Sequence, residues 1–359
     1  MAKRIAQMLY SMGMGGVENF LMNIYRNIDR EKYQFDFILQ TNERSYFDDE
    51  IEKLGGRIFR IPRFERHPIE HIKELKKILK ENEYIAFHRH TASSTVFVDL
   101  LVAKKCGIKR RIVHSHSTSH RCKVLNKFFR PVLYNSATVH LACGKEAGKW
   151  LYGNKPFEIL NNAIDCHKYF FSNETRFEYR QKLGVDNHIV IGHVGRFDDA
   201  KNQRYLIKVF KKICEKKSNY KLLLCGDGAL RNELEKECDN YNIADKVVFL
   251  GVRKDVNSIL QAIDIFAFPS KYEGVSLTLI EAQLSGLPII MSDKIAKETI
   301  YNPNVHMLGI SEYDVEIWAE RLIECKGEIL SRKDINENLI KDYDVNTIRD
   351  KLINEYISL

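Results

Sequence analysis

Short apolar runs alternate with longer amphipathic stretches along this chain of 359 residues, and this alternation restricts its fold more than any other feature. Apolar runs of about four to eight residues are typical of strands buried on both faces of a parallel sheet. The stretches between them are long enough for helices that cross from one strand to the next. The pattern therefore predicts an α/β fold with doubly wound parallel sheets, in which ligands bind at the carboxyl ends of the strands.

The chain is long enough for two domains, each with its own core. We place the boundary near residues 165–170, where the first series of strands ends. The expected strands of the first domain are 3–9, 34–40, 57–61, 84–90, 111–116 and 139–143, the last of which we expect to end the sheet. The expected strands of the second domain are 189–195, 221–225, 247–250, 264–268 and 288–291. Helices are expected at 69–80, 94–105, 315–330 and 344–359, among others.

The composition is that of a soluble globular protein, with 44% hydrophobic and 29% charged residues. No stretch approaches the roughly 20 apolar residues of a membrane span. Because the N-terminus leads directly into a strand pattern, we expect no signal peptide. The eight cysteines are scattered without a C-x-x-C pair, which favours reduced thiols over disulfides or a zinc site. These features predict a cytoplasmic protein.

The positive charge is concentrated in the first half of the chain. Residues 1–165 carry a net charge of +10, and residues 166–359 carry −2. A basic half suggests an anionic partner, either nucleic acid or acidic lipid headgroups. No nucleic-acid-binding module is recognisable, so we do not expect nucleic acid. The basic, partly apolar segment 121–130, together with Arg63, Phe64 and Arg66, could contact an anionic membrane surface or could equally be a solvated surface.

The segment E-G-V-S-L-T-L-I-E, residues 273–281, carries the clearest sign of a binding site. It follows an expected strand, and Ser276 is positioned to cap a helix whose first amide groups would then face a ligand. Such a helix start favours an anion, typically a phosphate. Glu273 and Glu281 would lie beside that anion, where carboxylates accept hydrogen bonds from hydroxyls such as those of a sugar. The alternative is two solvated glutamates that flank an ordinary turn.

Two further groups lie at expected strand ends. Gly15 and Gly16 follow the first strand and precede a helix, a weak phosphate-loop pattern that is not G-x-G-x-x-G. The next strand has no terminal acid to bind an adenosine ribose, which argues against a dehydrogenase. His88, His90, His114 and His116 lie at or near two other strand ends. No Cys, Asp or Glu accompanies them, so we do not expect a metal; histidines with a purely structural role remain an alternative.

The E-x7-E segment, followed by Ala282, Gly286 and Pro288, resembles the signature of retaining nucleotide-sugar glycosyltransferases of family 4, which have the GT-B fold. It is most similar to bacterial capsule and exopolysaccharide members, and the resemblance covers essentially the whole chain. It implies two Rossmann-like domains that face each other across a cleft. Residues 1–165 would form the acceptor-side domain, 166–340 the nucleotide-sugar domain, and 341–359 a C-terminal helix that returns to the first domain.

The resemblance also implies roles for individual residues. The implied donor-binding residues are Gly15, Gly16, Arg196, Lys201, Gly226, Val252, Arg253, Glu273, Gly274, Val275, Ser276, Leu277 and Glu281. Among these, Arg196 and Lys201 form a G-R-x4-K pattern whose cations bind the diphosphate. Glu273 would bind the sugar hydroxyls and Glu281 the ribose, while the base is held near Val252 and Arg253.

The second histidine of the H-x-H pattern, His116, would lie beside the donor sugar, and we expect His116, Arg196, Lys201 and Glu273 to be catalytic. Two positions depart from the family pattern. Ala163 replaces the glycine of the domain-junction motif, and Asn202 stands where glycine is commoner.

The function that the resemblance implies is metal-independent transfer of a hexose, with retention, from a nucleotide-sugar, and the resemblance favours UDP as the nucleotide. No cofactor is expected, because the nucleotide-sugar is a substrate. The acceptor would be a lipid-linked saccharide or a polysaccharide at the inner face of the plasma membrane. Two alternatives are a nucleotide-sugar epimerase and a catalytically silent GT-B scaffold subunit. The presence together of His116, Arg196, Lys201, Glu273 and Glu281 argues against both.

Overall fold

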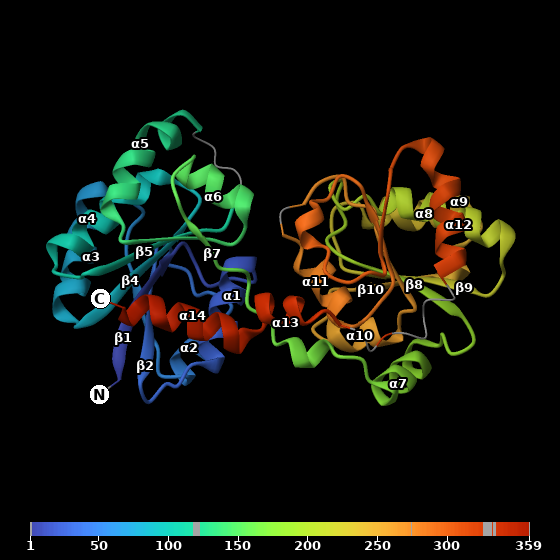
Figure 1. The fold of residues 1–359 in the computed structure, drawn as a ribbon, viewed down its shortest axis with the longest axis horizontal. Helices are drawn as coiled ribbons and strands as arrows, with labels where there is room; N and C mark the ends of the chain where they lie inside the picture. The colour runs from blue at the N-terminus through green and yellow to red at the C-terminus, as the bar shows by residue number, and fades with distance from the viewer. Residues whose placement is uncertain (1, 118–122, 274, 326–331, 333–334, 359) are drawn as a thin grey trace. The chain divides into compact units, whose positions relative to one another are not determined.

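The chain divides into two compact units, each built on its own parallel sheet (Figure 1). The computed structural model describes residues 2–117, 123–273, 275–325, 332 and 335–358. Unit 1 comprises Met1–Asp165 and Asp342–Leu359, and unit 2 comprises Cys166–Lys341. The C-terminal segment is therefore part of the unit that the N-terminus begins. Helix α13, Glu337–Tyr343, contains the point at which the chain passes from unit 2 back to unit 1.

Unit 1 holds a parallel sheet with the order β3-β2-β1-β4-β5-β6-β7. Its strands are β1 (Lys3–Leu9), β2 (Tyr33–Leu39), β3 (Arg57–Arg60), β4 (Tyr84–Thr91), β5 (Arg110–Ser115), β6 (Val139–Ala142) and β7 (Glu158–Ile159). Its helices are α1 (Gly16–Asn27), α2 (Asp48–Lys53), α3 (Pro68–Glu81), α4 (Phe97–Lys105), α5 (Lys123–Ser136), α6 (Lys145–Tyr152) and α14 (Val345–Ile357). The strand order reverses between β1 and β4, which makes the carboxyl ends of these two strands the expected ligand position.

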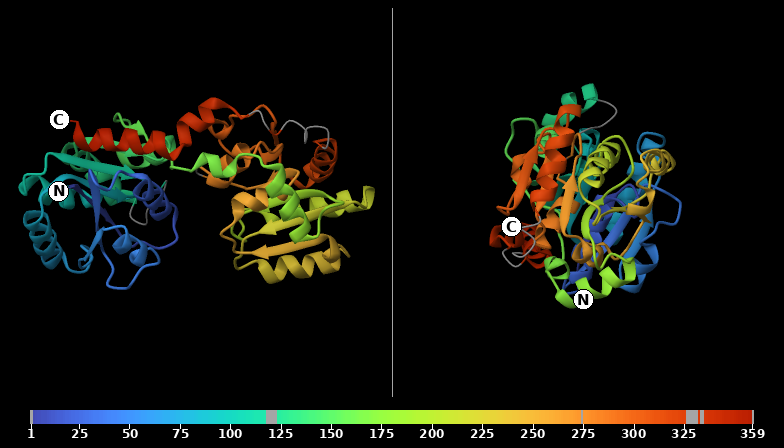
Figure 2. Two further views of the ribbon diagram at one scale, coloured as in Figure 1. Left: turned by 90° about the horizontal axis from the view of Figure 1, so that it is seen from below. Right: turned by 90° about the vertical axis from the view of Figure 1, so that its right-hand side faces the viewer.

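The two faces of the unit 1 sheet are covered by different helices. Helices α1 and α14 pack on one face, where Phe20, Ile24 and Tyr356 belong to the same apolar core. Helices α3, α4, α5 and α6 supply the core on the other face, which includes Leu75 and Leu100. In Figure 2, α14 runs along unit 1, and both chain termini lie in this unit. Helix α14, the last described helix of the chain, thus covers part of one face of the first sheet.

Unit 2 repeats the architecture with a sheet of order β10-β9-β8-β11-β12-β13. Its strands are β8 (Ile189–Val194), β9 (Tyr220–Cys225), β10 (Val247–Gly251), β11 (Ile265–Phe268), β12 (Ile289–Ser292) and β13 (Val305–Leu308). Its helices are α7 (Asn173–Leu183), α8 (Gln203–Lys216), α9 (Arg231–Asn240), α10 (Val256–Ala262), α11 (Leu277–Leu284) and α12 (Val315–Glu324). Helices α8, α9 and α12 cover one face, and α10 and α11 the other (Figure 1). The strand order reverses between β8 and β11, so this is the expected ligand position of unit 2.

The α/β fold with two Rossmann-like parallel sheets is confirmed, and the strands predicted from the sequence lie within one or two residues of their observed positions. One expectation was wrong: residues 139–143 do not end the first sheet, because the two-residue strand β7 pairs with β6. A strand of two residues is too short to show an alternation of apolar and polar residues, so the sequence does not reveal it. The helix expected at 315–330 is observed as α12 over Val315–Glu324, and residues 326–330 lie outside the described part of the chain.

None of the described helices is both long enough and apolar enough to cross a membrane.

Candidate functional site

In unit 2, two loops meet at the point where the strand order reverses. One loop leads from β8 to α8 and carries Arg196 and Lys201, and the other leads from β11 to α11 and carries Glu273. The amide of Lys271 donates to the carbonyl of Ala200 at 2.8 Å. The side-chain amide of Asn202 donates to the carbonyl of Pro269 at 3.1 Å. These bonds hold the basic loop and the acidic loop together at the carboxyl ends of adjacent strands.

Lys201 and Glu273 form an ion pair across these loops. The Lys201 Nζ atom lies 2.5 Å from Glu273 Oε1, and the two side chains are only 18% and 14% exposed. The ammonium also lies 5.4 Å from the centre of the Phe268 ring. Because little water reaches the pair, its charges interact more strongly than they would on an open surface. The structure therefore brings together two residues that the sequence resemblance assigns to the diphosphate and to the sugar.

Arg196 presents its side chain to solvent on a backbone that is fixed on both sides. Its side chain is 79% exposed, and its Nε donates to Asp198 Oδ2 at 2.8 Å. Although burial opposes the shift, this hydrogen bond and the nearby backbone amides lower the pKa of Asp198. The amide of Gly195 donates to the carbonyl of Cys225, and the amide of Phe197 donates to the carbonyl of Asp227, both at 2.9 Å. The Arg196 side chain is thus accessible to a ligand, while hydrogen bonds of its backbone neighbours fix the position of the loop that carries it.

The turn after β9 requires glycine where it passes the backbone on either side of Arg196. Gly226 has a φ of +139°, and a Cβ atom there would lie 2.0 Å from the carbonyl oxygen of Gly195. A Cβ at Gly228 would lie 2.4 Å from the carbonyl oxygen of Phe197. The Gly-x-Gly turn predicted from the sequence is therefore explained by the close approach of two backbone segments. Gly226 acts on the site by allowing the Arg196 loop to be held in place.

A buried histidine beneath this loop was not singled out by the sequence. His193 Nδ1 bonds to the carbonyl of Ala267 at 2.9 Å, so this nitrogen carries the proton. The Gln203 side-chain amide donates to His193 Nε2 at 3.1 Å and to the carbonyl of Arg196 at 2.9 Å. Burial lowers the pKa of His193 to about 4, so the ring is neutral at physiological pH. His193 and Gln203 therefore connect β8, β11 and the loop that carries Arg196. The sequence does not reveal these contacts, because they depend on the pairing of β8 with β11.

Helix α11 begins next to Glu273. Ser276 occupies the N-cap position and is buried, and its side chain makes no capping hydrogen bond to the helix. The first turn, with Leu277, has no acidic residue, and Val275 precedes the cap. This arrangement leaves the helix start suited to an anion supplied from outside the chain. Gly274, which the resemblance also implicates, lies outside the described residues.

Glu281 lies one and a half turns into α11 and has a partner that the sequence did not reveal. The Tyr169 hydroxyl donates to Glu281 Oε1 at 2.9 Å. Burial raises the pKa of Glu281, and the Tyr169 hydrogen bond opposes this effect. One carboxylate oxygen is thus oriented by tyrosine, and the carboxylate is held in a water-poor environment where it is a strong acceptor.

The segment after β10 was expected to contact the base. Gly251 has a φ of +68°, and the Val252 side chain that follows is 73% exposed. Both the Nε and the Nη2 atoms of Arg253 donate to Asp255, at 2.8 and 2.6 Å. The Arg253 hydrogen bond, together with one from the Tyr179 hydroxyl, lowers the pKa of Asp255 to about 2 against the effect of burial. Because the Arg253 guanidinium is occupied by Asp255, this segment offers mainly its backbone to a ligand.

In unit 1, helix α1 follows the glycine loop and contacts two of the histidines. Gly15 is the N-cap of α1, and its carbonyl accepts from both the amide and the side chain of Asn19. Neither Gly15 nor Gly16 has a positive φ. Phe20, one turn further along α1, lies with its ring 5.4 Å from His114 and 5.7 Å from His116. Phe20 therefore connects the helix that Gly15 caps with His114 and His116.

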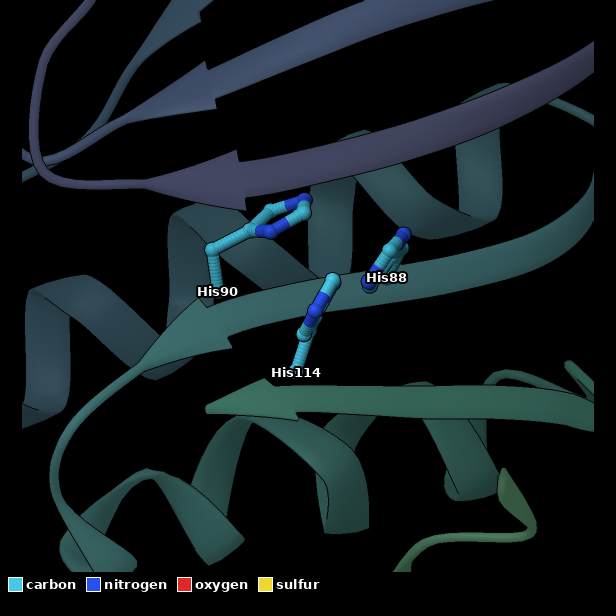
Figure 3. A group of neighbouring side chains, drawn as sticks. All are labelled: His88, His90 and His114. Carbon is cyan, nitrogen blue, oxygen red and sulfur yellow. The ribbon is translucent and has the colours of Figure 1, made fainter. Parts of the chain in front are cut away.

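The four histidines form one array at the ends of β4 and β5 (Figure 3 shows three of them). His88, His90 and His114 are buried, whereas His116 is partly exposed. Enclosure by neighbouring residues lowers the pKa of all four and brings that of His116 to about 3. At physiological pH the array is therefore a set of neutral imidazoles.

Three of these histidines are close enough to raise the question of a metal ion. Ligand nitrogens of His88, His90 and His114 all lie within 4.8 Å of one another (Figure 3). However, the rings of His88 and His114 are parallel to within 6°, with centroids 5.6 Å apart. Lone pairs of parallel, stacked rings do not converge on one point, and both nitrogens of His90 are already hydrogen bonded. This geometry does not suit a tetrahedral ion.

Comparison with known proteins agrees with the architecture of both units. The family described as Glycosyl transferases group 1 matches residues 175–342, and the one described as Glycosyltransferase Family 4 matches residues 14–168. The chain belongs to this family of glycosyltransferases, and its fold is of the GT-B class. HepE of Anabaena, solved in complex with UDP and glucose, is similar with a TM-score of 0.78 and 20% identity, over 99% of this chain and 100% of that one.

Two relatives are similar over nearly their whole length. EpsF of Bacillus subtilis (strain 168), which is named a glycosyltransferase, is 33% identical over 99% of this chain and 96% of its own. The UDP-Gal:alpha-D-GlcNAc-diphosphoundecaprenol alpha-1,3-galactosyltransferase of Escherichia coli is 24% identical over 96% of this chain and 94% of its own.

Proposed function

We propose that this glycosyltransferase moves a hexose from a UDP-sugar, with retention of configuration, to a lipid-linked or polysaccharide acceptor in surface polysaccharide synthesis. The observation that carries the proposal is the Lys201–Glu273 pair, held where the strand order of unit 2 reverses. A cation beside a carboxylate suits a ligand that has both phosphate oxygens and hydroxyl groups. The names of the relatives, which include a UDP-galactose-dependent enzyme, support the choice of donor.

In the proposed reaction, the bond between the anomeric carbon and the diphosphate oxygen breaks as the acceptor hydroxyl attacks from the same face. The acceptor's proton passes to the departing phosphate oxygen. Negative charge grows on the diphosphate, and Arg196, Lys201 and the first amides of α11 would stabilise it. These groups supply the positive charge that a divalent ion supplies elsewhere, so we propose that no metal and no cofactor take part.

The remaining residues act on parts of the donor. Glu273, released from Lys201 when the diphosphate arrives, would accept hydrogen bonds from the sugar hydroxyls. Glu281, with Tyr169 holding one oxygen, would accept from the ribose hydroxyls. His116 of unit 1 would bind the transferred sugar. The backbone near Val252 would hold the base.

The acceptor side is proposed to include a membrane surface. Helix α5 leaves four apolar side chains exposed, of which Val124 and Phe128 are 82% and 72% exposed. Lys123 and Lys127 are exposed on the same helix. Exposed apolar side chains among lysines are typical of helices that lie on anionic lipid. Arg121, which we also implicated, lies outside the described residues, and Arg63 and Phe64 instead pack on Tyr10 and His71. We therefore propose a peripheral, cytoplasmic location for the enzyme.

The experiment that tests the function begins with a thermal-shift panel of UDP, GDP, ADP and dTDP, followed by their sugars. A nucleotide at about 100 times its dissociation constant stabilises by roughly 2.7 kcal/mol, which is readily measured. We expect UDP to give the largest shift, and incubation of the UDP-sugar with lipid-linked acceptors to give an α-linked product by NMR. A larger shift with GDP would contradict the donor assignment. Epimerised sugar without transfer, or nucleotide binding without any product, would favour the epimerase or the scaffold instead.

A further inference from the structure

A continuous chain of hydrogen bonds links the C-terminal helix to His116 within unit 1. It begins at Tyr356 on α14, where the side-chain amide of Gln7 donates to the tyrosine hydroxyl at 2.8 Å. His90 Nε2 then lies 3.0 Å from Gln7 Oε1. His90 Nδ1 lies 3.0 Å from His116 Nε2. Four side chains from four separate segments are thus joined in one line.

The chemistry of the groups fixes where each proton lies. Because Gln7 uses its amide group on Tyr356, its carbonyl oxygen faces His90 and can only accept, so His90 Nε2 carries a proton. A neutral imidazole has one N–H, which leaves His90 Nδ1 as an acceptor. His116 Nε2 must therefore donate to it, and the second nitrogen of His116, Nδ1, is left with a lone pair. Desolvation by the surrounding residues lowers the pKa of both histidines, so they remain neutral at physiological pH.

The packing around the chain holds this arrangement in place. Gln7 and Tyr356 are buried, and His88 Nδ1 lies 2.8 Å from the same Tyr356 hydroxyl, which can donate its proton there. The rings of His114 and His116 lie 3.9 Å apart, and those of His88 and His90 lie 4.0 Å apart. Buried side chains that are joined by hydrogen bonds in this way restrain one another. The chain runs from the buried core to His116, which is the partly exposed member.

We propose that Gln7, His90 and Tyr356 are positioning residues that hold His116 with a proton on Nε2 and a lone pair on Nδ1. This rests on the proposed function, in which His116 binds the donor sugar. A lone pair on Nδ1 selects a sugar group that donates a hydrogen bond, namely a hydroxyl or an amide N–H. It disfavours a carboxylate, which would face the lone pair without a proton between them. We infer that the sugar group facing His116 is a hydroxyl or an amide N–H, as a hexose or N-acetylhexosamine can supply, and not the carboxylate of a uronic acid.

The tautomer can be measured on the whole protein without substrate. Histidine ring nitrogens labelled with ¹⁵N distinguish the two tautomers by chemical shift, and the signals of His116 are those lost in His116→Gln. At pH 7 we expect wild-type His116 to be protonated on Nε2. Gln7→Leu and Tyr356→Phe should convert it to a mixture of tautomers. Tyr152→Phe, which removes another buried hydroxyl of unit 1 that bonds Val113 and Leu141, is the matched control and should leave the signals unchanged.

Kinetics then separate positioning from simple destabilisation. Tyr356→Phe should lower kcat about tenfold, the worth of one hydrogen bond, with less than a twofold change in the KM for the donor. UDP-hexuronate should be used at least about tenfold less well than UDP-hexose by wild type, and this preference should shrink in Gln7→Leu. Tyr152→Phe should keep both the rate and the preference if it folds with a similar Tm.

Two results would overturn the proposal. One is wild-type His116 protonated on Nδ1, and the other is a tautomer that Gln7→Leu and Tyr356→Phe leave unchanged. If the tautomers behave as expected but His116→Gln turns over at the wild-type rate, the role of His116 in the proposed function fails. The positioning role then fails with it, although the donor site of unit 2 stands. If instead no nucleotide-sugar binds at all, the proposed function fails while the tautomer of His116 is still correctly assigned.

Discussion

The ammonium of Lys201 lies 2.5 Å from the carboxylate of Glu273, so the cation and the acid at the centre of the candidate donor site neutralise each other in the free protein. A diphosphate that binds Lys201 must compete with Glu273, and the carboxylate it displaces becomes available to sugar hydroxyls. Free nucleotide can contact only Lys201, through its diphosphate, whereas a nucleotide-sugar can also contact Glu273 through its sugar hydroxyls. The pair therefore provides a physical reason for tighter binding of the intact donor than of the product.

Replacement of either basic residue should weaken nucleotide binding by different routes. Arg196→Ala removes an exposed cation, so UDP affinity should fall about tenfold with no change in Tm beyond about one degree. Lys201→Ala should weaken UDP similarly but also lower the Tm, because it leaves Glu273 partly buried without a counter-charge. Calorimetry and thermal unfolding measure both. Wild-type UDP affinity in either variant would show that the residue does not contact the diphosphate.

The two glutamates of the E-x7-E segment should separate kinetically. Glu281→Gln should weaken UDP and UDP-sugar alike. Glu273→Gln should not weaken UDP, because it removes the charge that competes for Lys201, but it should lower kcat with the sugar donor. A hydrogen bond to a charged group contributes about 1.5–3 kcal/mol, which corresponds to a loss of roughly 10- to 150-fold. Tyr169→Phe is a matched variant, since it removes only the hydroxyl that orients Glu281, and should weaken UDP by less. Wild-type turnover in both glutamate variants would mean that neither carboxylate takes part.

Acidification should destabilise both units through histidines whose folded-state pKa values are lowered, namely His193 and His116. The folded-state pKa of His193 is lowered to about 4 and that of His116 to about 3, both from an ordinary value of 6.5. Below pH 6.5 the unfolded chain takes up protons that the folded chain does not, so stability falls as the pH falls from about 6.5 towards 4. Each such histidine contributes a slope of about 1.4 kcal/mol per pH unit in this window.

Urea unfolding at pH 7.5, 6.5, 5.5 and 4.5 measures this slope. His193→Asn can keep a donor to Ala267 but does not titrate, so its slope should be smaller by about one proton. A free energy of unfolding that is constant from pH 6.5 to 5, or an unchanged slope in His193→Asn, would contradict the expected protonation states.

Turnover should survive removal of divalent ions. Arg196, Lys201 and the start of α11 supply positive charge to the departing diphosphate, and the ring planes of His88 and His114 do not converge on one point. Activity after treatment with excess chelator, together with metal analysis of the purified protein, tests this expectation. Loss of activity that manganese restores would show that an ion is required and would make the histidine array its first candidate site.

Binding to membranes should depend on α5 and on salt. Phe128→Ser and Val124→Ser should each reduce co-sedimentation with anionic vesicles several-fold, because they remove exposed apolar side chains without changing charge. Ile159→Ser, which replaces an exposed apolar residue on β7, serves as the control. Affinity should fall as ionic strength rises, since the Debye length shortens to about 8 Å at physiological salt. Equal binding to neutral vesicles would remove the electrostatic part of the proposal.

The fold could be predicted from the sequence because most of its strands are short, apolar and regularly spaced. Strands such as β1 and β8 are buried nearly throughout, so their hydrophobic runs stand out against amphipathic helices. Strand β7 has two exposed residues and strand β13 has none that are fully buried, so neither produces such a run. Both edge strands pair with a single neighbour, and the partner, rather than the local sequence, decides that they are strands.

The residues of the candidate donor site could be predicted from the sequence only in part. The E-x7-E segment and the G-R-x4-K pattern identified Glu273, Glu281, Arg196 and Lys201 as residues of interest, because their spacing relative to a strand end is local information. The pairing of Lys201 with Glu273 and of Tyr169 with Glu281 was not predicted. Lys201 and Glu273 follow two strands that pair only in the folded sheet, and Tyr169 reaches Glu281 from the short 3-10 helix Cys166–Tyr169, which packs on α11.

By itself the sequence determined the type and approximate position of most strands and helices, the family, and the candidate donor-binding residues. These features follow from patterns and motifs that each span only a few residues. Only the tertiary structure decided the partners of those residues. Gln7 and Tyr356 are 349 residues apart, yet they share a hydrogen bond because α14 packs on the sheet that β1 begins. A contact of that kind depends on how whole elements bury their apolar faces, and no local pattern encodes it.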